Sequence, residues 1–180
     1  MLNKKSIKFT TYLIGPIEDD KTSLAGTGTT WRDKITIPLK QLKGEVLDPC
    51  KLEKEKLAGL HVLRLPESII SYITGEKIEV SHWHNLKNAS EPHFKARFKS
   101  YMRKIIAYDL GLVRKSDFVI VFWDRWSAGS SGEITVAYDE GIPIYIVSGI
   151  ELPAWHVGAA SKIFLNFEDL IKFLEREYGE

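Results

Sequence analysis

The sequence predicts an α/β fold with a single doubly wound, mostly parallel five-stranded sheet flanked by helices. Two nearly continuous apolar runs, Phe118–Trp123 and Ile142–Val147, are typical of strands that are covered on both faces. Segments with helical periodicity alternate with the predicted strands, which is the order that builds a parallel sheet. A length of 180 residues corresponds to one domain. We therefore expect one domain of the Rossmann or flavodoxin type over residues 1–180.

The remaining strands and the helices are expected from shorter patterns. Ile7–Ile14 and Gly44–Leu47 are β-favouring, and each is followed by a break that contains a proline. The apolar stretch Ile163–Leu165 supplies a fifth strand. Helices are expected over Trp31–Leu42, Phe94–Arg114, Ser131–Glu140 and Phe167–Tyr178.

Residues 51–95 interrupt this alternation and are predicted to be an elaboration over the sheet. The segment is divided by Pro66, Gly75 and Pro92. It carries four of the five histidines of the chain, which are His61, His82, His84 and His93. A metal site is conceivable, but no carboxylate or cysteine accompanies the histidines at ligand spacing, and an exposed polar loop is favoured. We therefore predict no metal.

The composition excludes several classes of protein. Lys and Arg number 25 against 24 Asp and Glu, so no overall charge favours nucleic acid or an anionic membrane. The apolar runs are far shorter than the ~20 residues that span a bilayer, and no signal peptide is recognisable. The single cysteine, Cys50, cannot form an internal disulfide. These observations predict a cytoplasmic protein that binds neither nucleic acid nor membrane.

In a doubly wound sheet, ligands bind beyond the carboxyl ends of the strands. The segments to inspect are therefore Gly15–Thr30, after the first strand, and Asp124–Gly132, after the third. Gly15 would let the backbone approach a ligand closely, although a plain Gly-Pro turn is the favoured explanation. Gly26-Thr27-Gly28 is weakly similar to a phosphate-binding loop, but neither a Walker lysine nor a dinucleotide fingerprint is present. No nucleotide cofactor is expected.

Two carboxylates are candidates for chemistry. Asp109 continues the apolar stripe of a predicted helix, so it must be hydrogen-bonded, paired or facing a ligand. A structural acid is the plain alternative. Glu133 follows the small-residue loop Ser127–Gly132. Ser130 lies three residues before Glu133 and matches a capping box, which would explain the acid without any function. Alternatively, the hydroxyls and N–H groups of the loop bind sugar or phosphate oxygens beside the carboxylate.

Four motifs in order resemble those of nucleoside 2-deoxyribosyltransferases and the related nucleoside 5′-monophosphate N-glycosidases. They are Tyr12-Leu-Ile-Gly-Pro16, Asp109-x7-Asp117, Ser127-x-Gly-x-x-Gly-Glu133 and Gly141-Ile-Pro-Ile144. Glu133 follows Asp117 by sixteen residues, which is the spacing of that family. The resemblance spans residues 8–147, with a gap at 51–95.

The resemblance implies an enzyme that cleaves the N-glycosidic bond of a 2′-deoxyribonucleoside and transfers the deoxyribosyl group to another base or to water. Glu133 would be the nucleophile that carries the glycosyl group, and Asp109 would be the acid that handles protons or contacts the base. Tyr12 would position Glu133 or the sugar. The implied partners are a nucleoside or nucleoside 5′-monophosphate and a free nucleobase.

The resemblance also implies a set of substrate-binding residues and an assembly. The set comprises Gly15, Pro16, Lys21, Arg32, Asp124, Ser127, Gly129, Ser130, Ser131, Gly132, Trp155 and His156. Ser127 leaves room for a phosphate, as in the monophosphate N-glycohydrolases. The loop after Pro16 has no clear arginine to bind one, although Lys21 and Arg32 are candidates. The sequence therefore leaves three alternatives, which are an enzyme acting on a nucleoside, an enzyme acting on a nucleotide, and a nucleotide-sensing module without catalysis. Trp155 and His156 would be lent to a neighbouring subunit of a homo-oligomer with shared active sites, unless Trp155 is simply a core residue.

Overall fold

The computed structural model describes residues 7–15, 31–49, 51–52 and 92–179, with only the backbone of 92–102. The chain divides into two compact units, residues 1–49 with 109–180 and residues 50–108. The first unit contains the whole sheet. Of the second unit the structure describes mainly the first part of one helix, so the predicted elaboration over residues 51–95 lies largely outside the described residues and stays a prediction.

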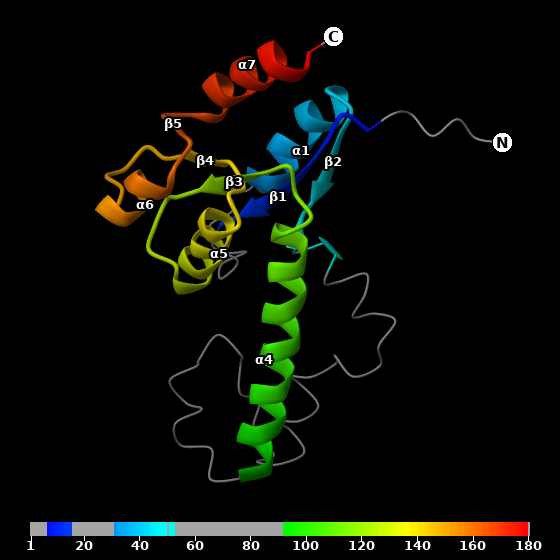
Figure 1. The fold of residues 1–180 in the computed structure, drawn as a ribbon, viewed down its shortest axis with the longest axis vertical. Coiled ribbons are helices and arrows are strands. Elements are labelled where there is room, and N and C mark those ends of the chain that lie inside the picture. The colour runs from blue at the N-terminus through cyan, green and yellow to red at the C-terminus, as the bar shows by residue number, and fades with distance from the viewer. Residues whose placement is uncertain (1–6, 16–30, 50, 53–91, 180) are drawn as a thin grey trace, which may run out of the picture. The chain divides into compact units, whose positions relative to one another are not determined.

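The first unit is a five-stranded, all-parallel sheet with the strand order β2-β1-β3-β4-β5 (Figure 1). The strands are β1 (Phe9–Ile14), β2 (Gly44–Leu47), β3 (Phe118–Phe122), β4 (Ile144–Val147) and β5 (Lys162–Phe164). The helices are α1 (Trp31–Gln41), α4 (Pro92–Val113), α5 (Ala128–Asp139), α6 (Ala154–Ala159) and α7 (Phe167–Tyr178). The predicted fold class is confirmed.

The chain winds outward in both directions from the pair β1 and β3. The connection through α1 leads from β1 to the edge strand β2, whereas the connections through α5 and α6 lead from β3 to β4 and β5. The strand order therefore reverses between β1 and β3. A ligand of a doubly wound sheet binds beyond the carboxyl ends of the strands at such a point.

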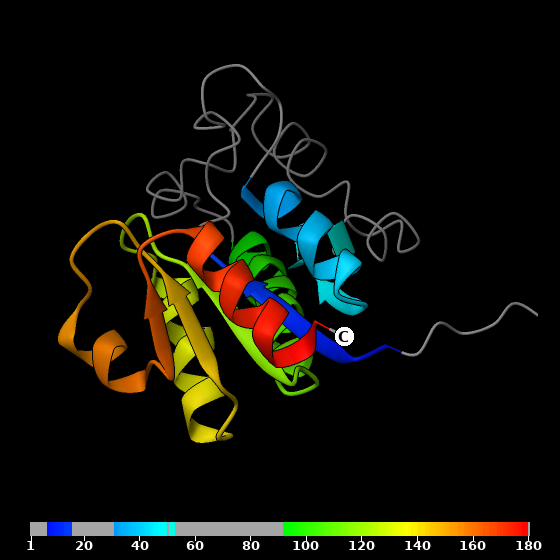
Figure 2. The same cartoon turned by 90° about the horizontal axis from the view of Figure 1, so that it is seen from above.

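The two faces of the sheet are covered by different helices. Alternate residues of a strand point to opposite faces. One face joins α1 and α7, which lie side by side (Figure 2), in a core made of Phe9, Leu13, Ile35, Leu39, Phe118, Ile120, Val147, Leu170, Phe173 and Leu174. Tyr12 points to the opposite face of the sheet, toward α5.

Most predicted element boundaries differ from the observed ones by one to three residues, and local hydrogen bonds explain two of the differences. The helix α5 begins at Ala128 rather than Ser131, because Ser127 caps it. The strand β4 begins at Ile144 rather than Ile142. The α5 terminus extends through Gly141, at φ +68°, and the Ile142 N–H bonds back to the Ala137 carbonyl. The six-residue helix α6 was not predicted at all.

The close contact between β2 and β1 yields a prediction about stability. A Cβ at Gly44 would overlap the Phe9 ring and lie 3.0 Å from the Leu39 carbonyl oxygen. Gly44→Ala should therefore lower the free energy of unfolding by about 1–3 kcal/mol, the usual cost of overpacking. Gly111→Ala is the matched control, because a Cβ there meets nothing within 4 Å. In helix α4 the control should leave stability unchanged or raise it by up to about 1 kcal/mol. Urea unfolding in which Gly44→Ala is as stable as the wild type would contradict the packing described for Gly44.

Candidate active site

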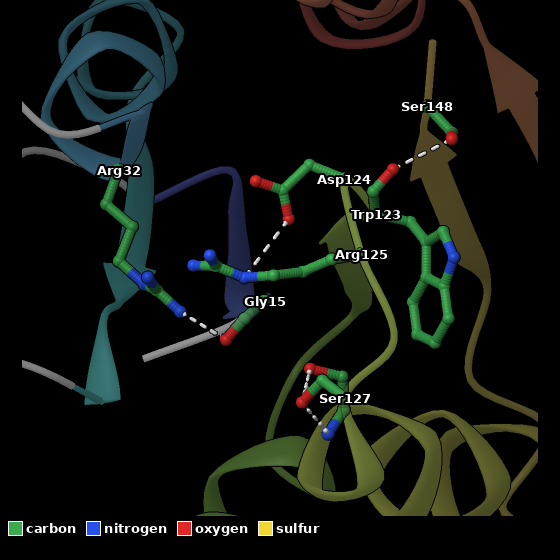
Figure 3. Close-up of polar contacts among 8 residues, drawn as sticks. Gly15, Arg32, Trp123, Asp124, Arg125, Ser127 and Ser148 are labelled. Carbon is green, nitrogen blue, oxygen red and sulfur yellow. Dashed lines mark hydrogen bonds and ion pairs between the residues drawn. The ribbon is translucent and has the colours of Figure 1, made fainter. Parts of the chain in front are cut away.

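The candidate site lies beyond the carboxyl ends of β1, β2, β3 and β4. Figure 3 shows residues that follow β1, β3 and β4, together with Arg32 of α1, around one region. Gly15 ends β1, the segment from Trp123 to Ser127 joins β3 to α5, and Ser148 follows β4. The Ser148 hydroxyl donates to the Trp123 carbonyl over 2.8 Å, which ties the ends of β3 and β4 together. The region is the one that the reversal of strand order predicts.

A hydrogen bond joins β1 to α5 at the centre of this region. The Tyr12 hydroxyl donates to Oε1 of Glu133 over 2.7 Å. Tyr12 is completely buried, so its ring has a single orientation set by the packing of β1. Glu133 is half-buried in the second turn of α5. A carboxylate that accepts a bond from a rigid donor is held in one orientation, as a reacting group requires.

The first turn of α5 is built from serines whose hydroxyls bond to one another. The Ser127 Oγ accepts from the Ser130 backbone N–H at 3.3 Å, which makes Ser127 the helix N-cap. The Ser130 hydroxyl lies 3.0 Å from the same oxygen (Figure 3). Ser131 donates its hydroxyl to the Ser127 carbonyl at 3.0 Å.

These bonds rule out the capping box considered for Ser130 and Glu133, because the N-cap is Ser127 and Glu133 lies beyond the first turn. The capping explanation of Glu133 is therefore wrong. The structure also brings Gly129 and Gly132 into the same two turns, where a Cβ would meet no atom within 4 Å. These glycines keep the surface of the turn free of side chains.

The Arg32 side chain bonds to other residues of its own chain. Its guanidinium donates to the Gly15 carbonyl over 2.9 Å (Figure 3), and its Nε lies 3.4 Å from Oδ1 of Asp48. Both side chains of this ion pair are almost fully buried, at 6% and 5% exposure. The guanidinium also lies 4.5 Å from the centre of the Trp31 ring. Arg32 therefore fixes the end of β1 where the strand meets the site.

Gly15 is needed for the same arrangement. A Cβ on this residue would lie 2.7 Å from Cζ2 of Trp31 and 3.2 Å from the Phe122 carbonyl oxygen. The glycine thus allows the first turn of α1 and the end of β3 to approach the end of β1. Pro16 and Lys21, the other sequence candidates in this connection, lie outside the described residues.

Arg125 is a cation at this edge that the sequence analysis did not single out. Its Nε lies 3.9 Å from Oδ1 of the predicted site residue Asp124, and both side chains are partly exposed. Figure 3 shows the side chain extending beneath Asp124, with Gly15 below it in the view. The sequence does give one indication of Arg125, because the residue belongs to the segment Asp124–Gly132 that is expected to face the ligand.

Trp155 and His156 are adjacent on α6 but have opposite environments. Trp155 is 68% exposed, so it is not a core residue. His156 is 5% exposed and its ring centre lies 4.2 Å from that of Trp123. Its Nε2 lies 3.3 Å from the Ser131 hydroxyl. Burial lowers the pKa of His156 below its ordinary value, so the ring is neutral at physiological pH.

Asp109 is buried in the last turns of α4, as the apolar stripe predicts, and Leu112 is buried one turn later. Of the histidines in residues 51–95, only the backbone of His93 is described. Within the described part of the chain no cluster of three His, Cys, Asp or Glu side chains could hold a metal ion. None of the helices described is long and apolar enough to cross a membrane.

Comparison with known proteins finds solved structures that share this fold. A 2-deoxyribosyltransferase from the psychrotolerant bacterium Bacillus psychrosaccharolyticus superposes with a TM-score of 0.54 and 14% identity, covering 90% of each chain. The chain shares the fold of a 2-deoxyribosyltransferase. A conserved protein from Enterococcus faecalis V583 matches with a TM-score of 0.53 and 16% identity, over 93% of this chain and 98% of the other. No family model and no curated protein matches the sequence.

The buried ion pair between Arg32 and Asp48 yields a prediction about stability. Asp48→Ala should lower the free energy of unfolding by about 3–5 kcal/mol, because it leaves the Arg32 charge buried without its carboxylate. The control is Glu140→Ala, which removes the partner of Arg114 from an exposed pair and should cost about 1 kcal/mol or less. Equal, small losses in chemical denaturation would show that Arg32 is not held by Asp48.

Proposed function

We propose that this protein cleaves the N-glycosidic bond of a 2′-deoxyribonucleoside and transfers the deoxyribosyl group to another base or to water. The observation that carries the proposal is the Tyr12–Glu133 hydrogen bond, at 2.7 Å, beyond the point where the strand order reverses. A nucleophilic carboxylate needs a fixed direction of attack, and a buried tyrosine supplies one. The fold shared with a 2-deoxyribosyltransferase supports the same reaction class.

In the proposed reaction, a carboxylate oxygen of Glu133 attacks C1′ of the sugar. The C1′–N bond breaks through an oxocarbenium-like transition state, and its electron pair leaves with the base. Asp109 donates the proton that neutralises the departing base. The product of this step is a glycosyl ester of Glu133.

An incoming base or a water molecule then attacks C1′ from the face that the first base left. The ester bond breaks, its electron pair returns to the Glu133 carboxylate, and Asp109 accepts the proton of the nucleophile. Two inversions at C1′ give net retention of configuration. Transfer and hydrolysis differ only in the nucleophile of this second step.

The Tyr12 hydroxyl has two proposed effects on Glu133. It keeps the carboxylate oriented before the attack, and it stabilises the carboxylate again when the ester breaks. A hydrogen bond to a charged group contributes about 1.5–3 kcal/mol. Tyr12 is therefore proposed as a catalytic residue that contacts the nucleophile.

The first turn of α5 is proposed to bind the 5′ end of the sugar. Ser127, Ser130 and Ser131 surround this turn, and Gly129 and Gly132 leave its backbone accessible. A nucleoside 5′-monophosphate is a second candidate substrate, because the cation Arg125 and Ser127 belong to the same connection between β3 and α5. Other proposed binding groups are Gly15, Pro16, Lys21 and Asp124.

Arg32, which the sequence analysis placed among these binding groups, is proposed to act indirectly by fixing the Gly15 carbonyl. Trp155 is proposed to reach a neighbouring subunit, since its side chain is exposed. Light scattering together with turnover measurements would test this last point. A fully active monomer would contradict it.

A panel of deoxyribonucleosides, ribonucleosides and their 5′-monophosphates tests the proposal, with the free base measured by chromatography. Release of base with and without an acceptor base separates transfer from hydrolysis. Binding of a nucleotide without release of base from any compound would instead indicate a sensing module and would refute the enzyme.

Glu133→Gln should lower base release by on the order of 10⁴-fold or more, because an amide cannot form the glycosyl ester. The control is Glu175→Gln, the same substitution on the exposed face of α7. Circular dichroism should show that both variants fold. Wild-type turnover in Glu133→Gln would exclude Glu133 as the nucleophile.

Tyr12→Phe should lower kcat by roughly 10- to 100-fold, with KM nearly unchanged. It removes one hydrogen bond to a charged group, worth about 1.5–3 kcal/mol, and keeps the ring that fills the buried site. Steady-state kinetics on the best substrate of the panel measures this split. An increase in KM alone would instead make the hydroxyl a contact to the sugar.

Ser127→Asp tests which 5′ group is bound. Aspartate and asparagine both cap helices well, so Ser127→Asn is a control of equal shape without the charge. If the substrate is a 5′-monophosphate, Ser127→Asp should weaken it at least about tenfold more than Ser127→Asn does, through like-charge repulsion. Nucleoside turnover should survive both changes. Equal losses for nucleoside and monophosphate would show that this turn does not contact the 5′ end.

A further inference from the structure

His156 connects α6 to the first turn of α5 from a buried position. Its Nε2 lies 3.3 Å from the Ser131 hydroxyl, and its ring packs on Trp123 with 4.2 Å between ring centres. The residue is 5% exposed. Three segments thus meet at one imidazole: the end of β3, the start of α5, and α6.

The hydrogen bonds of Ser131 favour one tautomer of this imidazole. Ser131 has one hydroxyl proton, which it donates to the Ser127 carbonyl over 3.0 Å. With the hydroxyl proton in that bond, the contact with His156 is one in which Nε2–H donates to the Ser131 oxygen. In that tautomer Nδ1 carries no proton, which suits an atom that is buried without a hydrogen-bond partner among the described residues. The Ser131 hydroxyl therefore connects His156 to Ser127, the N-cap residue of α5.

The helix α6 provides little stability of its own for this contact. It has six residues, and its N-cap, Pro153, makes no side-chain capping bond. Short helices in proteins are held mainly by packing. The packing of α6 against α5 is therefore what positions His156, and the imidazole in turn restrains the Ser127–Ser131 turn.

We propose that His156 is a positioning residue that holds the Ser127–Ser131 turn in the conformation that binds the 5′ end of the substrate. This inference rests on the function proposed above. The role differs from the one first expected for His156, since a side chain buried in its own subunit is not available to a neighbour. Glu133 has its own support from Tyr12, so loss of the imidazole should disturb binding more than chemistry.

Three substitutions of His156 test the tautomer and the role together. His156→Gln places an amide N–H near the Nε2 position, His156→Asn places one near the Nδ1 position, and His156→Leu removes both. Leu and Asn should raise KM by roughly 3- to 10-fold, the effect of one lost hydrogen bond, with a smaller change in kcat. Gln should restore KM to near the wild-type value. Val157→Ala, at an exposed position of the same helix, is the control.

A double-mutant cycle separates positioning from a general loss of stability. Ser131→Ala should remove most of the effect of His156→Leu on KM, because the two residues act through one contact. Thr135→Ala is the matched control, since its hydroxyl bonds only to the Ser131 carbonyl one turn away. Its effect should add to that of His156→Leu. Additivity with Ser131→Ala, or restoration by Asn rather than Gln, would overturn the proposal.

A measurement without substrate distinguishes failure of this inference from failure of the proposed function. Nitrogen NMR of the imidazole should show a neutral ring with the proton on Nε2, and Ser131→Ala should shift that signal. A proton on Nδ1 would overturn the inference even in an active enzyme. If the protein releases no base from any substrate but shows the Nε2–H signal, the proposed function fails while the contact itself stands.

Discussion

The hydrogen bond between Tyr12 and Glu133 connects the centre of the sheet to the helix that carries the candidate nucleophile. Its donor comes from β1 and its acceptor from α5, which are separated by 121 residues in the sequence. The bond exists because β1 and β3 are neighbours and α5 returns from β3 across the face that Tyr12 occupies. The carboxylate is therefore positioned by the sheet itself rather than by a loop.

The surrounding contacts serve to keep the strand ends in place around that bond. Asp48 after β2 and Arg32 on α1 hold the end of β1, and Ser148 after β4 holds the end of β3. Each contact joins polar groups that are buried, and burying a polar group is costly unless it is hydrogen-bonded or paired. The proposed division of roles follows: Tyr12 orients the nucleophile, whereas His156 and Ser131 shape the turn that binds the other end of the sugar.

The sequence predicted the sheet because β3 and β4 are apolar along their whole length and helical segments alternate with the strands. Its predictions failed at α6, which has too few residues for a periodic pattern, and at the start of α5. There Ser127, Ser130 and Ser131 are all plausible caps, and only the backbone shows which serine is the cap. Contacts such as Arg32 with Asp48 or Ser131 with His156 join residues 16 or 25 positions apart in the sequence. Neither residue type nor spacing indicates them, because tertiary packing alone decides which side chains meet.

The most direct test of the central claim is to look for the sugar on Glu133. A 2′-fluoro deoxyribonucleoside slows breakdown of a glycosyl ester, because fluorine destabilises the oxocarbenium-like transition state. Intact-protein mass spectrometry after mixing should show a gain equal to the fluorinated sugar, and peptide mapping should place it on Glu133. Free base released in the same reaction without any sugar on the protein, or with the sugar on another residue, would contradict the account.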